Sequence, residues 1–276
     1  MSVPNKTSKL HFISGLPRSG STLLSALLSQ NPRFYAGMSS PVCGLVSSLL
    51  EKASANNEFS TFIDDEKRRR ILAAVSESFY ADNKAEVIFD TSRAWCSRMS
   101  LINSLYPNAK VIACVRDMPW IIDSIEQLVQ KNAFQPSSIF NYLVGGTVYS
   151  RVDAVAKSDG MVGFAYNALK EAFFGGYAEN RLLLVRYESL VARPKEILNE
   201  IYKFIGEPAY EHDLNNIIFN ADDFDKKAGT PGLHHVRPKV SSVTRKTLLP
   251  PDLFQRFEND AFWNNPIANP GNVRIL

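Results

Sequence analysis

The sequence contains few cysteines and no long apolar run, and both scarcities narrow the kinds of protein that it can encode. Its 276 residues include three cysteines, Cys43, Cys96 and Cys114, an odd set without the spacing of a metal-binding motif. We therefore expect reduced thiols in an apolar core, as is typical of a reducing compartment. No apolar run approaches the roughly 20 residues that cross a bilayer, so we expect no membrane span.

A strong net charge is also missing. The 31 basic and 28 acidic residues give a formal net charge of +3, which is too small to predict a nucleic-acid-binding surface. The positive sign suits an anionic small molecule. The polar start MSVPNKTSKL, residues 1–10, lacks the apolar region of a secretory signal, so we expect a cytoplasmic protein.

Apolar runs alternate with segments of helical spacing along the chain. The runs predict strands within residues 10–14, 85–93, 109–117 and 181–190. Helical spacing is found in segments 21–31, 44–54, 64–82, 97–107, 118–131, 138–157, 161–177 and 194–206. Strands separated by helices favour a single α/β domain, residues 1–276, with a central parallel sheet flanked by helices. The less regular tail, about 208–276, is expected to lie over the ligand site.

Polar residues follow each predicted strand. They occupy 15–22, 90–93, 116–117 and 187–188. Because the carboxyl ends of parallel strands meet at one edge of a sheet, these four groups should converge and form a ligand crevice.

The loop GLPRSGST, residues 15–22, has the length and glycine positions of a P-loop. The position of the P-loop lysine holds Ser21, and a cation lies three residues earlier as Arg18. A loop that leads into a helix N-terminus offers backbone N–H groups and the positive end of the helix dipole to a phosphate. We expect phosphate contacts from Pro17, Arg18, Ser19, Gly20, Ser21 and Thr22.

Three segments resemble the PAPS-dependent sulfotransferases, which use 3′-phosphoadenosine-5′-phosphosulfate (PAPS) as sulfuryl donor. LPRSGSTLL, residues 16–24, is similar to the family's 5′-phosphosulfate loop in its Pro-Arg-Ser-Gly-[Ser/Thr]-Thr form. VIACVRDMPWIIDSIEQ, residues 111–127, resembles the 3′-phosphate-binding segment, with Arg116 and Ser124 at its key positions. A weaker likeness, over 183–208, is to the family's late strand and helix.

The resemblance implies an O-sulfotransferase that needs no metal ion. Arg18, Ser21 and Thr22 would stabilise the negative charge that develops on the leaving phosphate oxygen, and Arg116 with Ser124 would bind the 3′-phosphate. The acceptor would be a phenol or tyrosyl, sugar or natural-product hydroxyl, held by residues 37–50 and 132–148. The chain could form a homodimer, as family members commonly do, although the sequence shows no dimer motif.

The residue that takes the acceptor proton is less evident. The tyrosylprotein branch of the family uses a glutamate of a Gly-Glu-Glu-Thr stretch, where this sequence has Gly-Met-Ser-Ser, residues 37–40. The cytosolic branch uses a histidine, but no histidine lies between His11 and His212. The remaining candidates are Asp90, at a strand end expected to face the crevice, and the tail residues His234 and His235.

The tail string KKAGTPGLHHVR, residues 226–237, loosely resembles the cytosolic branch's closing loop over the donor. The likeness adds Lys227 and Arg237 as candidate donor contacts. Trp95 and Trp120 follow strand ends and could stack on adenine or an aromatic acceptor, although core packing is at least as good an interpretation.

Two other functions remain open. VIFD, residues 87–90, resembles a Walker B strand with Asp90 as metal partner, which would suit a P-loop kinase or nucleotide hydrolase. Ser21 argues against this alternative because it replaces the lysine that reaches the β- and γ-phosphates. An inactive nucleotide-binding module is the other alternative, since the base typical of either branch is missing.

Overall fold

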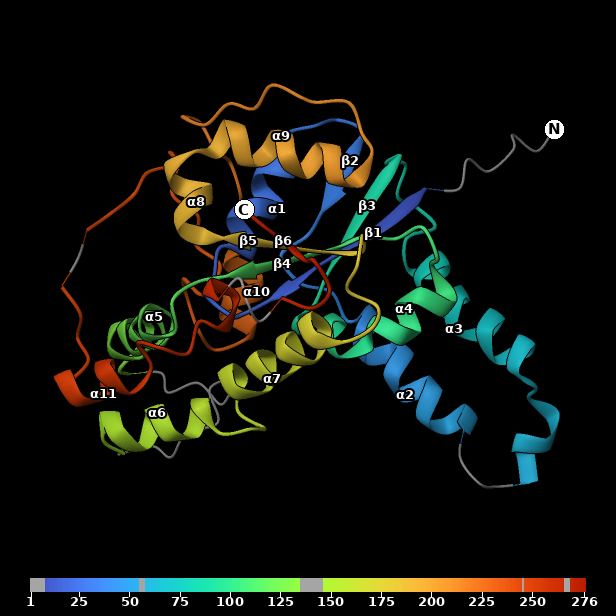
Figure 1. The fold of residues 1–276 in the computed structure, drawn as a ribbon, viewed down its shortest axis with the longest axis horizontal. Coiled ribbons are helices and arrows are strands. Elements are labelled where there is room, and N and C mark those ends of the chain that lie inside the picture. Colours follow the sequence, from blue (N-terminus) through green and yellow to red (C-terminus); the bar gives the residue numbers. More distant parts are fainter. Residues whose placement is uncertain (1–7, 55–57, 135–145, 245, 266–268) are drawn as a thin grey trace.

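A six-stranded parallel sheet runs through the middle of the molecule (Figure 1). The computed structural model describes residues 8–54, 58–134, 146–244, 246–265 and 269–276. The strands are β1 (Lys9–Gly15), β2 (Phe34–Ala36), β3 (Val87–Thr91), β4 (Val111–Val115), β5 (Leu182–Arg186) and β6 (Arg274–Ile275), in the spatial order β2-β3-β1-β4-β5-β6. All five strand pairings are parallel, which confirms the predicted α/β class.

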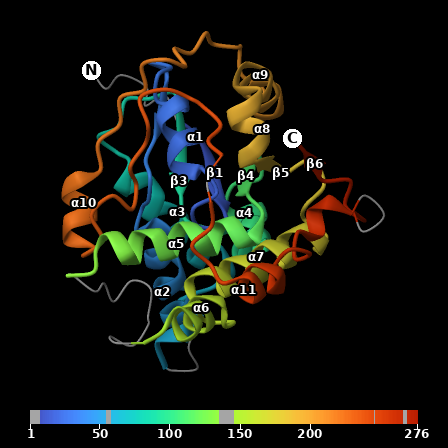
Figure 2. The same cartoon turned by 90° about the vertical axis from the view of Figure 1, so that its left-hand side faces the viewer.

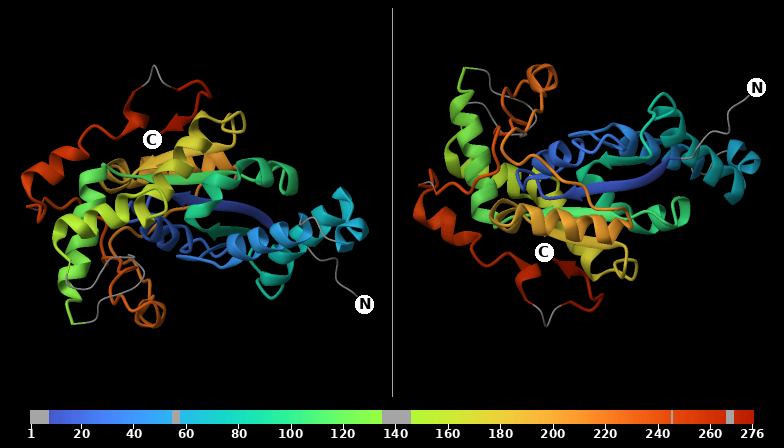
Figure 3. Two further views of the ribbon diagram at one scale, coloured as in Figure 1. Left: turned by 90° about the horizontal axis from the view of Figure 1, so that it is seen from below. Right: turned by 90° about the horizontal axis from the view of Figure 1, so that it is seen from above.

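Helices cover both faces of this sheet, as predicted. They are α1 (Ser21–Leu28), α2 (Val42–Ser54), α3 (Asp65–Phe79), α4 (Met99–Leu105), α5 (Met118–Lys131), α6 (Val148–Ala156), α7 (Met161–Phe174), α8 (Tyr187–Ala192), α9 (Pro194–Ile205), α10 (Asp222–Lys227) and α11 (Pro251–Arg256). Helices α1, α8 and α9 lie on one side of the sheet, and α4 to α7 lie on the other (Figures 1 and 3).

The strand β4 shows how the sequence supplies two cores. Val111, Ala113 and Val115 point into the cluster formed with α2 to α7, while Ile112 and Cys114 point into the cluster formed with α1, α8 and α9. Successive side chains of a strand face opposite sides of the sheet, so a continuous apolar run is what a doubly covered strand requires.

Local chemistry sets several helix ends. Asp64 caps α3 by accepting a hydrogen bond from the Lys67 N–H at 2.7 Å. Helix α9 begins with Pro194 and ends at Gly206, which has φ +70°. The predicted helix 97–107 is a 3₁₀ turn over Arg93–Arg98 followed by α4, and the predicted helix 138–157 begins only at Val148, with residues 135–145 outside the described part.

The tail does more than cover the domain. Figure 2 shows it running from α10 to α11, and its last residues form β6, which pairs with β5 through Leu183 and Arg274. Leu249, Leu253 and Trp263 of the tail are buried in the core on the α7 side. The tail therefore completes the sheet as well as lying over it.

All three cysteines are free and buried, which confirms the expected thiols in the core. Burial raises the pKa of Cys43 and Cys96 to about 11 and that of Cys114 to about 12, so these thiols are protonated near neutrality and poorly nucleophilic. Among the helices of the described residues, none is both long and apolar enough to cross a membrane.

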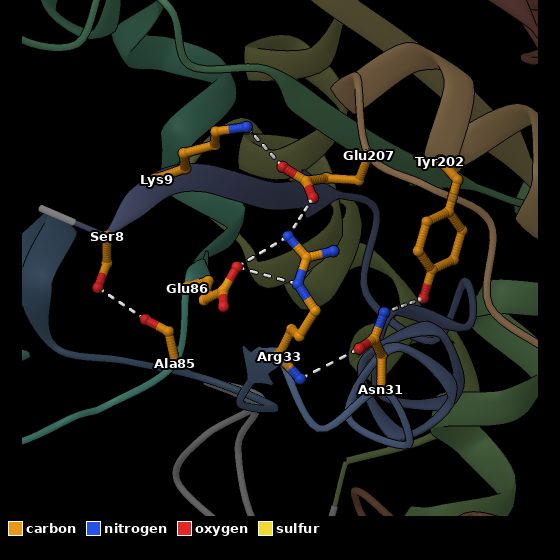
Figure 4. A network of polar contacts seen from close by, with 8 residues as sticks. All are labelled: Ser8, Lys9, Asn31, Arg33, Ala85, Glu86, Tyr202 and Glu207. Carbon is orange, nitrogen blue, oxygen red and sulfur yellow. Dashed lines mark hydrogen bonds and ion pairs between the residues drawn. The ribbon is translucent and has the colours of Figure 1, made fainter. Parts of the chain in front are cut away.

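A network of charged side chains ties the amino ends of β1, β2 and β3 to the end of α9 (Figure 4). Lys9 at the start of β1 bonds Glu207 at 2.6 Å, and Glu207 also accepts from Arg33 at 2.8 Å. Arg33 in turn bonds Glu86 at 2.9 Å, so the segments before β2 and β3 join the end of α9. Burial alone would raise the pKa of Glu207, but the bonds from Lys9 and Arg33 outweigh it and lower that pKa.

Candidate active site

A cleft of about 1110 Å³ opens at the carboxyl ends of β1, β3, β4 and β5. Its walls include residues 15–18, 20–23, 91–94, 116–117 and 187–188. This confirms the expectation that the residues following the four predicted strands converge, as they do at the ligand crevice of an open parallel sheet.

Two contacts of the loop 15–22 hold it tightly against β4. Gly15 has φ +102°, and a Cβ added there would lie 2.2 Å from the Cys114 carbonyl oxygen, so no other residue fits. The Ser19 hydroxyl is buried, 2.5 Å from the Leu16 carbonyl and 2.9 Å from the Cys114 carbonyl. The Ser19 hydroxyl therefore stabilises the loop, and Ser19 does not line the cleft. This corrects the expectation that the Ser19 side chain contacts a phosphate.

The rest of the loop presents its backbone and hydroxyls to the cleft. Gly20 has φ +93° and packs so close to Tyr187 that an added Cβ would lie 2.8 Å from that ring. Ser21 and Thr22 follow as the first residues of α1 and line the cleft with Pro17. Among the described side chains none caps α1, so the N–H groups of its first turn are available to an anion.

Arg18 connects three distant segments. Its backbone is left-handed, with φ +57°, and its Nε donates to the Ser124 hydroxyl of α5 at 3.1 Å. Its Nη1 donates to the carbonyl oxygen of Leu233 in the tail. The two phosphate motifs expected from the sequence thus touch each other directly, and the tail closes over both.

Arg116 follows β4 and faces the same cleft. Its guanidinium stacks over the Tyr187 ring, 4.5 Å from the centroid, and donates to the Arg18 carbonyl at 3.4 Å. Its Nε lies 3.8 Å from a carboxylate oxygen of Glu188. The Glu188 side chain is about half exposed, yet the crowded cleft mouth raises its pKa, first by desolvation and then through Asp117.

Asp90 is enclosed and does not face the crevice, which corrects the sequence-based expectation. Its carboxylate is fully buried and accepts from the Ser40 hydroxyl at 2.5 Å, the Tyr80 hydroxyl at 2.6 Å and Trp95 Nε1 at 2.5 Å. Both oxygens are engaged by side chains of three different segments. Asp90 and Trp95 therefore serve the packing around β3, and Trp95 is buried against Phe12 at 4.5 Å between ring centroids.

Trp120 on α5 does reach the cleft. It lines the wall and makes an edge-to-face contact with Phe254 of α11, with ring centroids 5.3 Å apart. The same face of α5 carries Ser124, Gln127, Leu128 and Lys131 along the cleft.

The tail contributes a histidine held by a carboxylate. His234, His235 and Arg237 line the cleft, and the sequence reasoning missed Lys239, which lines it too. His234 Nδ1 lies 2.6 Å from a carboxylate oxygen of Asp225, a residue that no sequence motif singled out.

Lys227 differs from the other tail candidates. It is exposed at the end of α10 and is not among the residues that line the cleft. The expectation that it contacts the donor is therefore corrected.

Apolar side chains also line the cleft. Phe164 and Phe224 are 41% and 42% exposed and line the cleft with Met38 and Met161. Of the segments expected to hold an acceptor, 37–50 reaches the cleft only through Met38 and Ser39, and 132–148 falls largely outside the described residues. Within the described part, no three His, Cys, Asp or Glu side chains group as metal ligands would.

The chain is similar to several known proteins. The family model described as "Sulfotransferase family" matches residues 11–212. Nodulation protein NoeE of Sinorhizobium fredii is 30% identical over 72% of this chain and 50% of its own length. Protein-tyrosine sulfotransferase 1 of Danio rerio is 21% identical over 87% of this chain and 64% of its own length. The chain thus spans about half to two thirds of these relatives.

A solved structure supports the fold alone. A sulfotransferase from Alicyclobacillus acidocaldarius superimposes with a TM-score of 0.50 at 13% identity, covering 80% of this chain and 89% of the other.

Proposed function

The chain belongs to the sulfotransferase family, and from this premise we propose that it transfers a sulfuryl group from PAPS to a hydroxyl acceptor. The observation that carries the proposal is the contact between Arg18 of the phosphate loop and Ser124 of α5, beside Arg116. Two cationic side chains from separate motifs meet there at the mouth of a helix N-terminus, which suits a ligand with two phosphate groups.

We assign the two ends of the donor as follows. The N–H groups at the start of α1, with Ser21, Thr22 and Arg18, bind the phosphosulfate end. Arg116 and Ser124 bind the 3′-phosphate, and the Tyr187 ring keeps the Arg116 guanidinium in place. The cleft, about 1110 Å³, exceeds the roughly 300–1,000 Å³ typical of single-ligand pockets, so it has room for donor and acceptor together.

The chemistry needs a base and a stabilised leaving group. The acceptor oxygen forms a bond to sulfur while the bond from sulfur to the 5′-phosphate oxygen breaks, and the acceptor proton passes to a base. Arg18 and the N–H groups of α1 stabilise the charge that appears on the phosphate oxygen. Of the three candidate bases we choose His234, because Asp90 is enclosed by three donors and His235 is exposed.

The acceptor is proposed to carry an apolar or aromatic body. Met38, Met161, Phe164 and Phe224 line the cleft, and a phenol or an alkyl hydroxyl would cover such side chains better than a sugar would. We place the reaction in the cytoplasm, where the three reduced thiols would remain unpaired.

A kinase or hydrolase fits the site less well. Ser21 replaces the lysine that would reach the β- and γ-phosphates, and Asp90, the candidate metal partner, already accepts three side-chain hydrogen bonds.

Thermal unfolding with two nucleotides tests the proposal. Adenosine 3′,5′-bisphosphate without metal should raise the melting temperature by about 5 °C at a hundredfold excess over its Kd, because a ligand that binds only the folded state stabilises it. ATP with magnesium should raise it much less. The reverse ranking would contradict the assignment of the donor.

A further inference from the structure

We infer that Asp225 is the positioning residue of a histidine–aspartate pair, in which it holds His234 so that Nε2 takes the proton of the acceptor hydroxyl. The inference rests on the proposed function, which supplies the acceptor. It gives a role to Asp225 of α10, which is not among the residues proposed to bind the donor.

Both carboxylate oxygens of Asp225 are directed to one residue. One oxygen lies 2.6 Å from His234 Nδ1, and the other accepts from the His234 backbone N–H at 2.8 Å. This double attachment fixes the ring relative to its own backbone. A carboxylate accepts hydrogen bonds only, so Nδ1 carries the proton and Nε2 is left with the lone pair that a base requires.

The surroundings hold the pair rigidly. Asp225 is 1% exposed, its N–H donates to the Ala221 carbonyl, and its carbonyl accepts from the Thr230 N–H, both at 2.9 Å. The Phe224 ring meets the His234 ring edge-on, with centroids 5.3 Å apart. Burying a carboxylate without a partner costs free energy, so the buried Asp225 side chain is most stable while it stays hydrogen-bonded to His234.

A purely structural pair could sit anywhere on the surface, but this one lies in the cleft. The His234 side chain is 17% exposed and lines the cleft wall. The preceding residue, Leu233, accepts the hydrogen bond from Arg18. His234 thus directly follows the residue that joins the tail to the proposed phosphosulfate loop. The acceptor oxygen must approach the sulfur beside that loop. Phe224, whose ring packs on that of His234, is one of the apolar side chains proposed to contact the acceptor.

The arrangement divides the work between the two side chains. His234 takes the proton as the acceptor oxygen bonds to sulfur, and the Asp225 carboxylate stabilises the imidazolium that forms. No oxidant, metal or further reactant is needed.

The free protein provides the first test. Long-range ¹⁵N–¹H correlation spectra of the wild-type protein should show His234 as the Nδ1–H tautomer at neutral pH. In Asp225→Asn this preference should be lost, whereas Asp223→Asn, an exposed change on the same helix, should leave it intact. An Nε2–H tautomer in the wild-type protein would overturn the inference without reference to any variant.

Transfer of labelled sulfuryl to a panel of phenols and alkyl alcohols provides the second test. His234→Gln should lower kcat by about 10² to 10⁴-fold, the usual worth of a general base, and Asp225→Asn should lower it by about tenfold or more. The affinity for adenosine 3′,5′-bisphosphate should stay within about twofold in both variants, and Asp223→Asn should match the wild type. Unchanged kcat in a folded Asp225→Asn protein would contradict the positioning role. Failure of the bisphosphate to bind the wild type would instead remove the proposed function, while the tautomer result would still stand.

Discussion

Arg18 keeps a left-handed backbone conformation, with φ +57°, which costs a residue with a β-carbon roughly 1–2 kcal/mol. Glycine would avoid this cost but would remove the guanidinium that reaches Ser124 and Leu233. Strain of this kind is found where the surrounding structure requires one particular side-chain direction. The direction of the Arg18 side chain lets its guanidinium connect the loop 15–22 to α5 and to the tail.

His11 is a second residue whose environment has a measurable consequence. It is buried in β1, where its Nδ1 accepts from the Lys110 N–H at 3.0 Å. Burial is the largest of the effects that lower the pKa of His11 to about 4; Glu207 opposes it, and Lys9 and Lys110 add to it.

We predict that the fold loses stability as the pH falls from about 6.5 to about 4. In that window the unfolded chain binds a proton at His11 and the folded chain does not, so the free energy of unfolding should decrease by up to about 3 kcal/mol. His11→Asn keeps an acceptor near the Nδ1 position and should flatten the pH dependence, with a residual slope from buried His212, whose pKa is also lowered. Urea unfolding between pH 7 and pH 4.5 measures both proteins, and parallel slopes would refute the assignment to His11.

Residue-level prediction succeeded for the proximity of residues that belong to motifs. Arg18, Arg116 and Ser124 were expected near one another, and the structure brings them together. It failed for Asp90 and Ser19, because sequence position at a strand end does not say whether a side chain turns inward. Asp225 lies nine residues from His234 along the chain, and no spacing rule links the two.

At the scale of elements, the segment 235–244 borders the cleft as a strap fixed at both ends. One end follows His234, which Asp225 holds. The other is fixed by Asp123 of α5, which is buried and accepts from the Thr247 hydroxyl at 3.0 Å and the Leu248 N–H at 2.7 Å. The two buried carboxylates hold the flanks of the strap, and its middle is held by backbone hydrogen bonds from the Ile217 N–H to the Pro238 carbonyl at 2.7 Å and from the Val240 N–H to the Leu214 carbonyl at 2.9 Å.

Asp123→Ala should loosen the strap. The change removes the carboxylate that accepts from Thr247 and Leu248, and a hydrogen bond to a charged group is worth about 1.5–3 kcal/mol, so the melting temperature should fall. Trypsin should then cut faster after Lys239 and Lys246. Asp153→Ala is the matched control, because Asp153 is 62% exposed and pairs with Arg256 at the surface. Equal cleavage rates in the wild type and Asp123→Ala would show that Asp123 does not hold the strap.

Prediction of elements followed the apolar runs. β1, β3, β4 and β5 were predicted because each has a run long enough to be buried on both faces. β2 and β6 were missed because three and two residues carry no periodicity. Their pairing depends on neighbours distant in sequence, as β6 depends on β5.

At the scale of the molecule, the two ends of the sheet have different roles. The charged network of Lys9, Arg33, Glu86 and Glu207 ties the amino ends of β1, β2 and β3 together, and the cleft lies at the carboxyl ends of the strands. Leu233 of the tail accepts a hydrogen bond from Arg18, which lies 215 residues earlier in the chain. Leu233 lies beyond residues 11–212, the part of the chain that matches the family model. The family resemblance could therefore predict the donor loop far better than the tail residues that we propose for the acceptor side.

The central claim is that this cleft binds a nucleotide with both a 5′- and a 3′-phosphate. Isothermal titration should find adenosine 3′,5′-bisphosphate bound about 10- to 100-fold more tightly than adenosine 5′-monophosphate, the worth of one charged contact. Arg116→Ala should nearly abolish that preference, and Arg193→Ala, a change at an exposed arginine paired with Glu196, should leave it intact. Equal affinity for the two nucleotides in the wild-type protein, or an undiminished preference in Arg116→Ala, would contradict the account.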